Sequence, residues 1–159
     1  MASKMIQGNE KEIVTFGRHT YSNGFPAFDW PNSGFYFTFR GNAVILSFSE
    51  FKKPYTFYVL VKVDNICQRF ALSTGNEKII IEGLQNKRHT IELIKITEGE
   101  ERIVFTGAEI FGTTPALLPS VPKEGLKIEF LGDSITAGYG NLAPATEKLF
   151  YTFQQDSTR

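Results

Sequence analysis

Apolar and polar side chains alternate with a period of two along much of the chain, which is the pattern of half-buried β-strands. The clearest stretch is 35–39, in which three phenylalanines at every second position are separated by Tyr36 and Thr38. Further apolar faces of this kind are predicted over residues 44–48, 57–63, 70–72, 79–81, 91–96 and 102–111. No segment shows convincing 3.6-residue periodicity, and the many Phe, Thr, Val and Ile residues suit strands. We therefore predict a mainly-β fold in which residues 12–112 form the two antiparallel sheets of a jelly-roll sandwich.

A turn signal separates two of these predicted strands. Gly41 and Asn42 lie between the alternating segments 35–40 and 44–48. Turn residues between two alternating segments are typical of a β-hairpin. The sequence thus predicts that these two strands pair directly through a tight turn.

The composition changes at Pro115, because three prolines lie at positions 115, 119 and 122. Proline fixes φ and removes a backbone hydrogen-bond donor. We therefore predict a semi-rigid linker, rather than a strand, over residues 115–125. This linker would separate a β-sandwich domain of residues 1–114 from the start of a second domain at residues 126–159.

A candidate catalytic turn follows the apolar run 126–131, which is predicted to be a strand. A nucleophilic serine needs its hydroxyl at a strand end, with backbone N–H groups nearby to hold the developing oxyanion. In Gly132-Asp133-Ser134, the glycine permits a tight turn and the aspartate is expected to hydrogen-bond the neighbouring backbone. Ser134 is the candidate nucleophile, and its own N–H is a candidate oxyanion donor. The alternative is an ordinary turn or helix N-cap, for which Asp and Ser are both favoured.

The segment 128–141 resembles the first motif block of the SGNH (GDSL-type) hydrolases. Together with residues 17–18, 28–39 and 89–93, it makes the chain similar to carbohydrate esterase family 2. Members of that family join an N-terminal jelly roll to a C-terminal SGNH domain and remove acetyl groups from plant-wall polysaccharides such as xylan and glucomannan. The resemblance implies that Ser134 is the nucleophile of an acetyl-esterase acting on an acetylated polysaccharide or oligosaccharide. It also implies no organic cofactor and no metal.

Other catalytic elements of that family have no counterpart in the sequence. The late Asp-x-x-His segment that supplies the base and the later Gly and Asn of the oxyanion hole are not found. Only 28 residues run from Gly132 to Arg159, whereas such an α/β domain needs roughly 200. We therefore expect a truncated SGNH domain without appreciable esterase activity of its own, whose first strand frays, pairs with a foreign edge or self-associates. The alternative is a carbohydrate-binding or structural β-sandwich module without chemistry.

Three residues are candidates for substrate binding. Trp30 lies in a turn-rich segment, and exposed aromatic rings stack on the apolar faces of sugars. Its alternative role is packing in the core at a strand end. Tyr139 follows the nucleophile turn and is a candidate wall of the acyl or sugar pocket, with packing on the sandwich as an equal alternative. Asn141, from the same motif block, is the third candidate.

The remaining reactive side chains predict no further site. His19 and His89 are the only histidines in the sequence, and both are interpreted as surface or turn residues rather than as a catalytic base. Cys67 is the only cysteine, so no internal disulfide is possible, and a buried, inert thiol is expected. His, Cys, Asp and Glu residues show no ligand spacing, so no metal site is predicted.

The charge pattern excludes two classes of partner. The sequence holds 17 Lys and Arg residues against 17 Asp and Glu residues, without a basic run. We therefore expect neither nucleic acid nor an anionic membrane surface as a partner. The N-terminus lacks the apolar stretch of a secretory signal, and no segment is long and apolar enough to span a membrane. The localisation stays open between an intracellular protein and a secreted one whose signal was removed.

Overall fold

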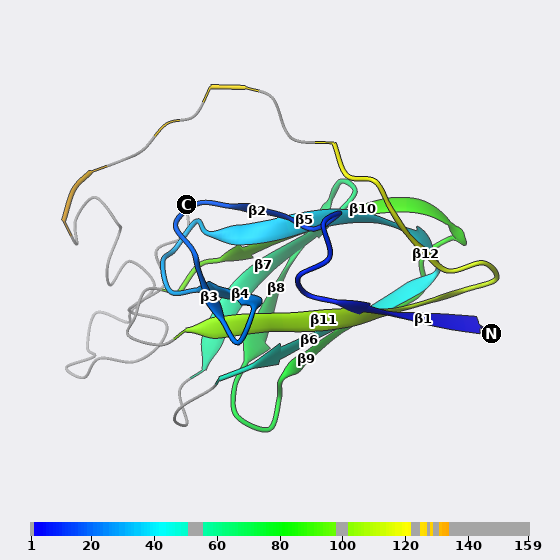
Figure 1. Cartoon of the computed structure of the whole chain (residues 1–159), viewed down its shortest axis with the longest axis horizontal. Coiled ribbons are helices and arrows are strands. Elements are labelled where there is room, and N and C mark those ends of the chain that lie inside the picture. The colour runs from blue at the N-terminus through cyan, green and yellow to red at the C-terminus, as the bar shows by residue number, and fades with distance from the viewer. Residues whose placement is uncertain are drawn as a thin grey trace.

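The computed structural model describes residues 2–50, 56–97 and 102–121, together with residues 125, 126, 128 and 131–133. In this part of the chain, all regular structure is β-strand, in two antiparallel sheets packed face to face (Figure 1). Sheet A consists, in spatial order, of β3 (Thr20–Ser22), β4 (Phe25–Phe28), β11 (Ile103–Gly112), β6 (Ala43–Ser49) and β9 (Lys78–Ile81), with β1 (Ala2–Gln7) also paired to β11. Sheet B consists of β12 (Ala116–Leu118), β5 (Gly34–Gly41), β10 (Lys87–Lys95), β7 (Phe57–Val63) and β8 (Ile66–Leu72), with β2 (Val14–Phe16) also paired to β5. The predicted β-sandwich is confirmed, and the described residues contain no helix that could cross a membrane.

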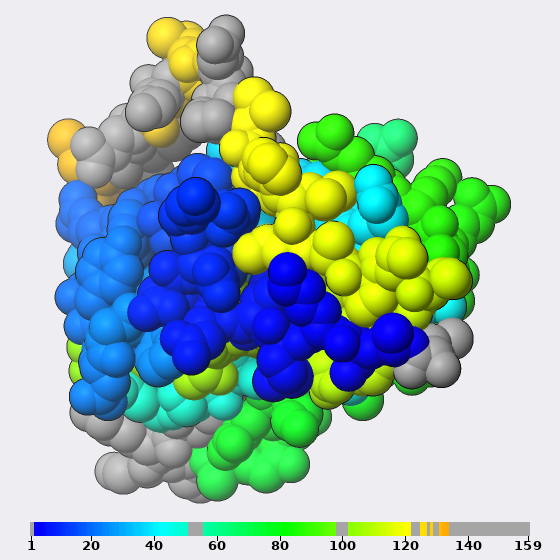
Figure 2. Space-filling model, turned by 45° about the vertical axis from the view of Figure 1, so that its right-hand side comes forward, coloured from blue at the N-terminus to red at the C-terminus, as the bar shows by residue number. Residues whose placement is uncertain are grey.

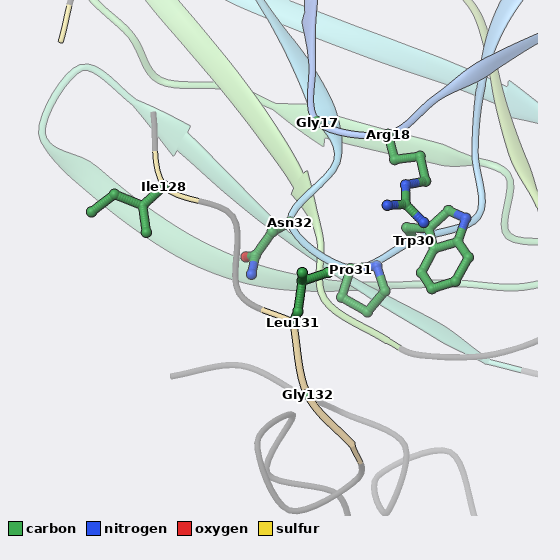
Figure 3. Close-up of a pocket in the computed structure, with 8 residues that line it drawn as sticks. All are labelled: Gly17, Arg18, Trp30, Pro31, Asn32, Ile128, Leu131 and Gly132. Atoms are coloured by element: carbon green, nitrogen blue, oxygen red, sulfur yellow. The ribbon is translucent and has the colours of Figure 1, made fainter. Parts of the chain in front are cut away.

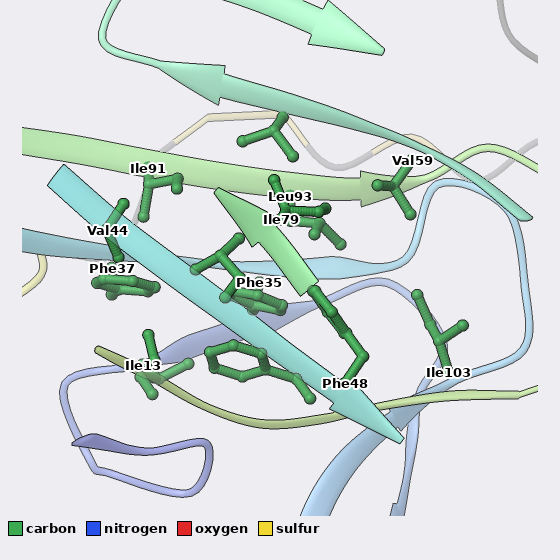
Figure 4. Packing of buried hydrophobic residues seen from close by; sticks show 14 of the residues in the cluster. Ile13, Phe35, Phe37, Val44, Phe48, Val59, Ile79, Ile91, Leu93 and Ile103 are labelled. Carbon is green, nitrogen blue, oxygen red and sulfur yellow. The ribbon is translucent and has the colours of Figure 1, made fainter. Parts of the chain in front are cut away.

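The core lies between the two sheets and is rich in phenylalanine (Figure 4). The inward-facing residues of β5, Phe35, Phe37 and Phe39, are fully buried. Phe105 of β11 stacks on Phe35 with 4.0 Å between the ring centroids, and its ring also lies 5.6 Å from that of Phe48. Aromatic pairs of this kind contribute about 0.5–1.5 kcal/mol beyond the burial of their area. These rings therefore tie sheet A to sheet B at the centre of the core.

The hairpin predicted at Gly41 and Asn42 is wrong, because the chain changes sheet there. β5 belongs to sheet B, whereas β6 belongs to sheet A. Gly41 lies so close to β11 that a Cβ atom would approach the carbonyl oxygen of Phe111 to 2.4 Å. The N–H of Asn42 donates to the same carbonyl at 2.8 Å. The backbone thus turns over the end of the sandwich instead of folding back within one sheet.

The segment predicted as a linker, 115–125, contains a strand. Ala116–Leu118 forms β12, which pairs antiparallel with β5 at the edge of sheet B. The N–H of Thr38 in β5 also donates to the hydroxyl of Ser120 at 2.9 Å. Proline is compatible with an edge strand, because the lost N–H would have faced solvent. The prediction of a linker without strand is therefore wrong at β12, and Figure 2 shows this yellow segment lying against the body of the sandwich.

The apolar run 126–131 is described at three positions. Leu126, Ile128 and Leu131 belong to no strand, and their exposed fractions are 88%, 64% and 88%. The strand predicted for this run is therefore not seen at these three residues. The start of a second domain at residue 126 stays a prediction.

Cys67 is exposed, which corrects the prediction of a buried thiol. It lies opposite Lys62 on β8, the outermost strand of sheet B. Lys62 is exposed, whereas its neighbours in β7, Val61 and Val63, face the core. Cys67 thus lies on the face of sheet B that is turned away from the core.

Candidate functional site

Three segments meet around a pocket of about 630 Å³, the Trp30 pocket (Figure 3). Its lining residues are Gly17 and Arg18 from the turn after β2, Trp30, Pro31 and Asn32 from the loop between β4 and β5, and Ile128, Leu131 and Gly132 from the segment that enters the Gly-Asp-Ser turn. Two candidates that lie far apart in the sequence, Trp30 and Gly132, therefore line the same pocket. A volume of this size lies within the roughly 300–1,000 Å³ of small-molecule sites.

Trp30 presents its ring to solvent rather than to the core. Its exposed fraction is 55%, so the alternative of core packing is wrong. The guanidinium carbon of Arg18 lies 4.8 Å from the centre of the Trp30 ring, a cation–π contact that covers part of it (Figure 3). An arginine beside an exposed indole combines an apolar platform with hydrogen-bond donors, which is the chemistry that a sugar ring and its hydroxyls require.

The loop that carries this tryptophan is held from the core side by Lys95, which is fully buried. The ammonium group of Lys95 donates to the carbonyl oxygen of Asp29 at 2.8 Å and also to that of Thr97. The Lys95 N–H donates to the Ser33 carbonyl at 2.9 Å, and the Asn32 N–H donates to the Lys95 carbonyl at 2.9 Å. A buried charge is tolerated only where such acceptors surround it. The side chain, the N–H and the carbonyl of Lys95 thus fix the loop on both sides of the tryptophan.

The turn that carries Arg18 is packed directly against the same loop. Gly17 has a φ of +68°, and a Cβ atom there would lie 2.7 Å from the carbonyl oxygen of Asn32 and 2.8 Å from Cα of Ser33. Only glycine fits this approach without strain. His19 supports the turn, because its Nδ1 lies 3.0 Å from the Gly17 carbonyl oxygen and donates to it. Its Nε2 then accepts from the hydroxyl of Thr15 at 3.1 Å.

His89 is buried, with an exposed fraction of 3%, so its prediction as a surface or turn residue is wrong. Its Nδ1 lies 2.8 Å from Oδ2 of Asp64, and its Nε2 lies 2.7 Å from the carbonyl oxygen of Gln85. Both partners are acceptors, so the ring bonds both only when each nitrogen carries a hydrogen. Partial burial acts to raise the pKa of Asp64, but hydrogen bonds from the Thr90 N–H and His89, and the positive charges of His89 and Lys87, hold that pKa below its ordinary value. His89 is therefore engaged through both ring nitrogens inside the sandwich.

The described residues contain only part of the predicted site. Trp30 and Gly132 line the pocket, whereas Asp133 is exposed and is not among the lining residues. The remaining candidates, Ser134, Tyr139 and Asn141, lie outside the described residues. Sequence reasoning missed Arg18 as a site residue, although its position next to a glycine in the family-like segment 17–18 was a usable signal. Within the described ranges, no three His, Cys, Asp or Glu side chains gather closely enough to hold a metal ion.

A protein-family model described as "Carbohydrate esterase 2 N-terminal" matches residues 15–120. Among curated proteins, the acetylxylan esterase / glucomannan deacetylase of Cellvibrio japonicus is 30% identical over 123 residues. That match covers 76% of this chain and 32% of the relative. The chain therefore spans about a third of the length of this curated relative.

Solved structures of family 2 carbohydrate esterases have the same fold. The enzyme from Cellvibrio japonicus superposes with a TM-score of 0.77 at 18% identity, covering 98% of this chain and 46% of that one. The enzyme from Clostridium thermocellum in complex with cellohexaose superposes with a TM-score of 0.72 at 27% identity, covering 91% of this chain and 44% of that one. Both matches extend over most of this chain but less than half of each relative.

Proposed function

The chain belongs to carbohydrate esterase family 2 and carries its N-terminal domain, and from this premise we propose that it is the N-terminal portion of a serine acetyl-esterase. The proposed substrate is an acetylated plant-wall polysaccharide of the xylan or glucomannan type, in line with the activity named for the curated relative. The sandwich supplies one wall of the substrate site, and the Gly-Asp-Ser turn supplies the nucleophile.

The observation that carries this proposal is the pocket shared by Trp30 and Gly132. A polysaccharide esterase must hold a sugar beside its nucleophile, so that the acetyl carbonyl lies within reach of the serine hydroxyl. Trp30, covered on one side by Arg18, offers the apolar surface on which a sugar ring packs. Gly132 is two residues from Ser134. Trp30 and a residue near the proposed nucleophile in the sequence thus line one cavity, which supports the proposal.

In the proposed reaction, the Ser134 hydroxyl attacks the acetyl carbonyl carbon and forms a tetrahedral intermediate. The backbone N–H of Ser134 donates to the developing oxyanion. The carbon–oxygen bond to the sugar then breaks, and the sugar oxygen leaves as a hydroxyl after taking up the proton that the serine lost. Water hydrolyses the acetyl-serine and releases acetate. Gly132 and Asp133 shape the turn in this scheme, and Tyr139 and Asn141 line the acyl or sugar pocket.

Acetate release by the esterase that carries this chain tests the proposal. Ser134→Ala should reduce the release of acetate from acetylated xylan and from a small activated acetyl ester by at least about 1,000-fold, because the nucleophile is lost. Trp30→Ala should lower kcat/KM for the polysaccharide about tenfold, the effect of about 1.4 kcal/mol. It should leave the small ester within about threefold, because that substrate has no sugar to stack.

Tyr21→Ala is the matched control for the tryptophan variant. Tyr21 is also an exposed aromatic residue of the sandwich, at 61%, but it does not line the pocket. This control should leave both substrates unchanged. Undiminished turnover in Ser134→Ala would exclude the proposed nucleophile, and an equal loss in Trp30→Ala and Tyr21→Ala would exclude the proposed wall.

A carbohydrate-binding module without chemistry is the second candidate function. It is favoured by the exposed Trp30 and its Arg18 partner, which belong to the sandwich itself. Trp30 is the only tryptophan in the sequence, so its fluorescence reports on this pocket directly. If saccharides quench or shift that fluorescence while acetate release is absent and insensitive to Ser134→Ala, the binding function is the correct one.

A further inference from the structure

Asn32, in the loop between β4 and β5, has a backbone conformation that is uncommon for a residue with a side chain. Its φ is +58°, in the left-handed region that asparagine tolerates and that glycine adopts without steric cost. The Asn32 N–H donates to the Lys95 carbonyl at 2.9 Å. On the other side, a Cβ atom at Gly17 would lie 2.7 Å from the Asn32 carbonyl oxygen. The fold therefore holds residue 32 in a conformation for which glycine would suffice and the amide is not needed.

The side-chain amide of Asn32 is directed into the Trp30 pocket. Asn32 is exposed and belongs to the lining of this pocket. Figure 3 shows its amide on the far side of Pro31 from the Trp30 ring, pointing toward the part of the pocket that Ile128 and Leu131 line. Within the described ranges, this amide makes no hydrogen bond with the protein, and the two side chains that it faces are apolar. Its hydrogen-bonding groups are thus presented to the occupant of the pocket.

An amide and an indole on one pocket wall restrict the chemistry of that occupant. The Asn32 side chain offers two N–H donors and one acceptor oxygen and carries no charge. Hydroxyl groups match it, because each hydroxyl can both donate and accept. Trp30, two residues away, offers an apolar ring surface. The wall is therefore suited to a molecule that has apolar ring faces edged by hydroxyl groups, as a saccharide has.

We propose that Asn32 is a substrate-binding residue of the Trp30 pocket, and that its amide hydrogen-bonds hydroxyl groups of the saccharide that packs on Trp30. The choice of a saccharide rests on the proposed function, whereas the contact itself rests on the conformation and direction of Asn32. An acetylated hydroxyl has no hydrogen to donate, so Oδ1 of Asn32 selects a free hydroxyl at this point of the substrate. Asn32 thereby favours substrates that keep a free hydroxyl beside the ring on Trp30.

Replacing Asn32 by glycine tests the proposal, because glycine keeps the backbone conformation and removes only the amide. Binding of xylohexaose and of mannohexaose to this chain is measured by isothermal titration calorimetry, and the thermal unfolding midpoint is recorded alongside. Asn32→Gly should weaken the binding about tenfold, because hydrogen bonds to the ligand are lost. The same variant should unfold at an unchanged or higher temperature, because the amide has no structural role.

A fully O-methylated xylohexaose tests the requirement for a free hydroxyl. This ligand keeps its oxygen acceptors but has no O–H donor for Oδ1 of Asn32. It should bind the unaltered chain about tenfold more weakly than xylohexaose does. In Asn32→Gly the difference between the two ligands should shrink to about threefold or less, because the group that senses the O–H is gone. An undiminished difference in this variant overturns the proposal.

Asn23→Gly is the matched control. Asn23 is also an exposed asparagine with a positive φ, +50°, but it lies in the turn between β3 and β4 and does not line the pocket. This variant should leave the binding unchanged. The proposal is overturned if Asn32→Gly binds as tightly as the unaltered chain, or if both glycine variants lose the same affinity. A lower unfolding temperature in Asn32→Gly also overturns it, since the amide then serves the fold.

Trp30→Ala, measured in the same titrations, separates this inference from the proposed function. A loss of affinity in Trp30→Ala without a loss in Asn32→Gly contradicts the role of Asn32 alone. The reverse result contradicts the role of Trp30 alone. If neither saccharide binds the unaltered chain, the Trp30 pocket is no saccharide site and this inference fails with it, whereas the esterase reaction is tested separately by the release of acetate.

Discussion

Asp64, together with His89, links the turn between β7 and β8 to the segment that precedes β10. Asp64 lies in the turn between β7 and β8 with a φ of +53°, and its Oδ1 accepts the N–H of Thr90 at 3.0 Å. Its other oxygen lies 2.8 Å from Nδ1 of His89, whose Nε2 lies 2.7 Å from the Gln85 carbonyl oxygen in the segment before β10. The Asp64 carboxylate therefore connects the turn between β7 and β8 to Thr90 and His89 of β10. The hydrogen bonds from these two residues help to lower its pKa.

The stability of the sandwich should depend on the charge of Asp64. Its pKa is lowered in the folded state relative to the ordinary value of 3.8, so it stabilises the fold above that pH and loses this effect as the pH falls through the lowered pKa. Asp64→Asn should lower the free energy of unfolding at pH 7 by about 1 kcal/mol or less, since the side chain is partly exposed. Urea unfolding at pH 7, 5, 3 and 2 should show this difference shrinking toward pH 2.

Glu77→Gln is the control, because Glu77 is exposed and carries the same charge change. It should show a smaller difference at pH 7. A difference for Asp64→Asn that grows toward acid pH would contradict the assigned direction of the pKa.

Residue type alone predicted the wrong depth for two side chains. His89 was expected at the surface but is buried, since it occupies an inward position of β10 and has acceptors for both ring nitrogens. Cys67 was expected to be buried but is exposed, because β8 is an edge strand and its outward face meets solvent. In both cases the depth of the side chain depends on tertiary structure, namely the hydrogen-bond partners of His89 and the edge position of β8. The residues next to them in the sequence do not show either feature.

At the scale of elements, the loop between β4 and β5 depends on β10. Lys95, at the end of β10, bonds the carbonyl of Asp29, the carbonyl of Ser33 and the N–H of Asn32. The hydroxyl of Ser33 also donates to the carbonyl of Trp30. The tryptophan platform is thus an extension of the strand framework rather than an independent surface loop.

Replacing Lys95 by methionine should disturb this platform. The change leaves carbonyl groups of Asp29 and Thr97 without their donor, at a cost of about 1–3 kcal/mol for each unmade bond, partly offset by removal of a buried charge. We expect a lower thermal midpoint and easier quenching of Trp30 fluorescence by acrylamide. Lys62→Met, on the exposed face of sheet B, is the control and should change neither measurement.

The period-two pattern of the sequence predicted which side chains face the core, but not which sheet each strand joins. Alternation over 35–39 and 44–48 correctly predicted which side chains face the core. It did not predict that the chain changes sheet at Asn42, because both sheets share one core and an inward side chain looks the same from either. The prolines around β12 led to the prediction of a linker, because proline is excluded from inner strands. An edge strand pairs along one side and can tolerate proline, so the prolines did not exclude a strand here.

For the whole molecule, cohesion between the sheets depends on rings that cross the core. Phe105 belongs to sheet A and stacks on Phe35 of sheet B, while β5 contributes two further buried phenylalanines. The period-two pattern predicted this core from the sequence. In contrast, the meeting of Trp30 with Gly132 could not be predicted, since about 100 residues separate them and only the tertiary fold brings them to one pocket.

Phe105→Ala should destabilise the whole sandwich rather than one end of it. Truncation of a fully buried phenylalanine costs about 3–5 kcal/mol, since contacts are lost and a cavity remains. Denaturant unfolding, followed by far-UV circular dichroism and by Trp30 fluorescence, should shift to lower midpoints with both signals coincident. The exposed Tyr21→Ala should leave the midpoint within about 0.5 kcal/mol. Separate transitions for the two signals would contradict a core shared by both sheets.

The point at which the chain leaves the sandwich limits how far the Gly-Asp-Ser sequence can lie from β5. The Tyr36 hydroxyl donates to the Val121 carbonyl at 3.3 Å, so the last described contact with β5 is at that residue. Eleven residues lead from Val121 to Gly132, a reach of at most about 40 Å. A group tethered by so short a linker has an effective concentration on the order of millimolar near the sandwich. Even a weak contact between Gly132 and the rest of the Trp30 pocket is then enough to keep the two together for much of the time.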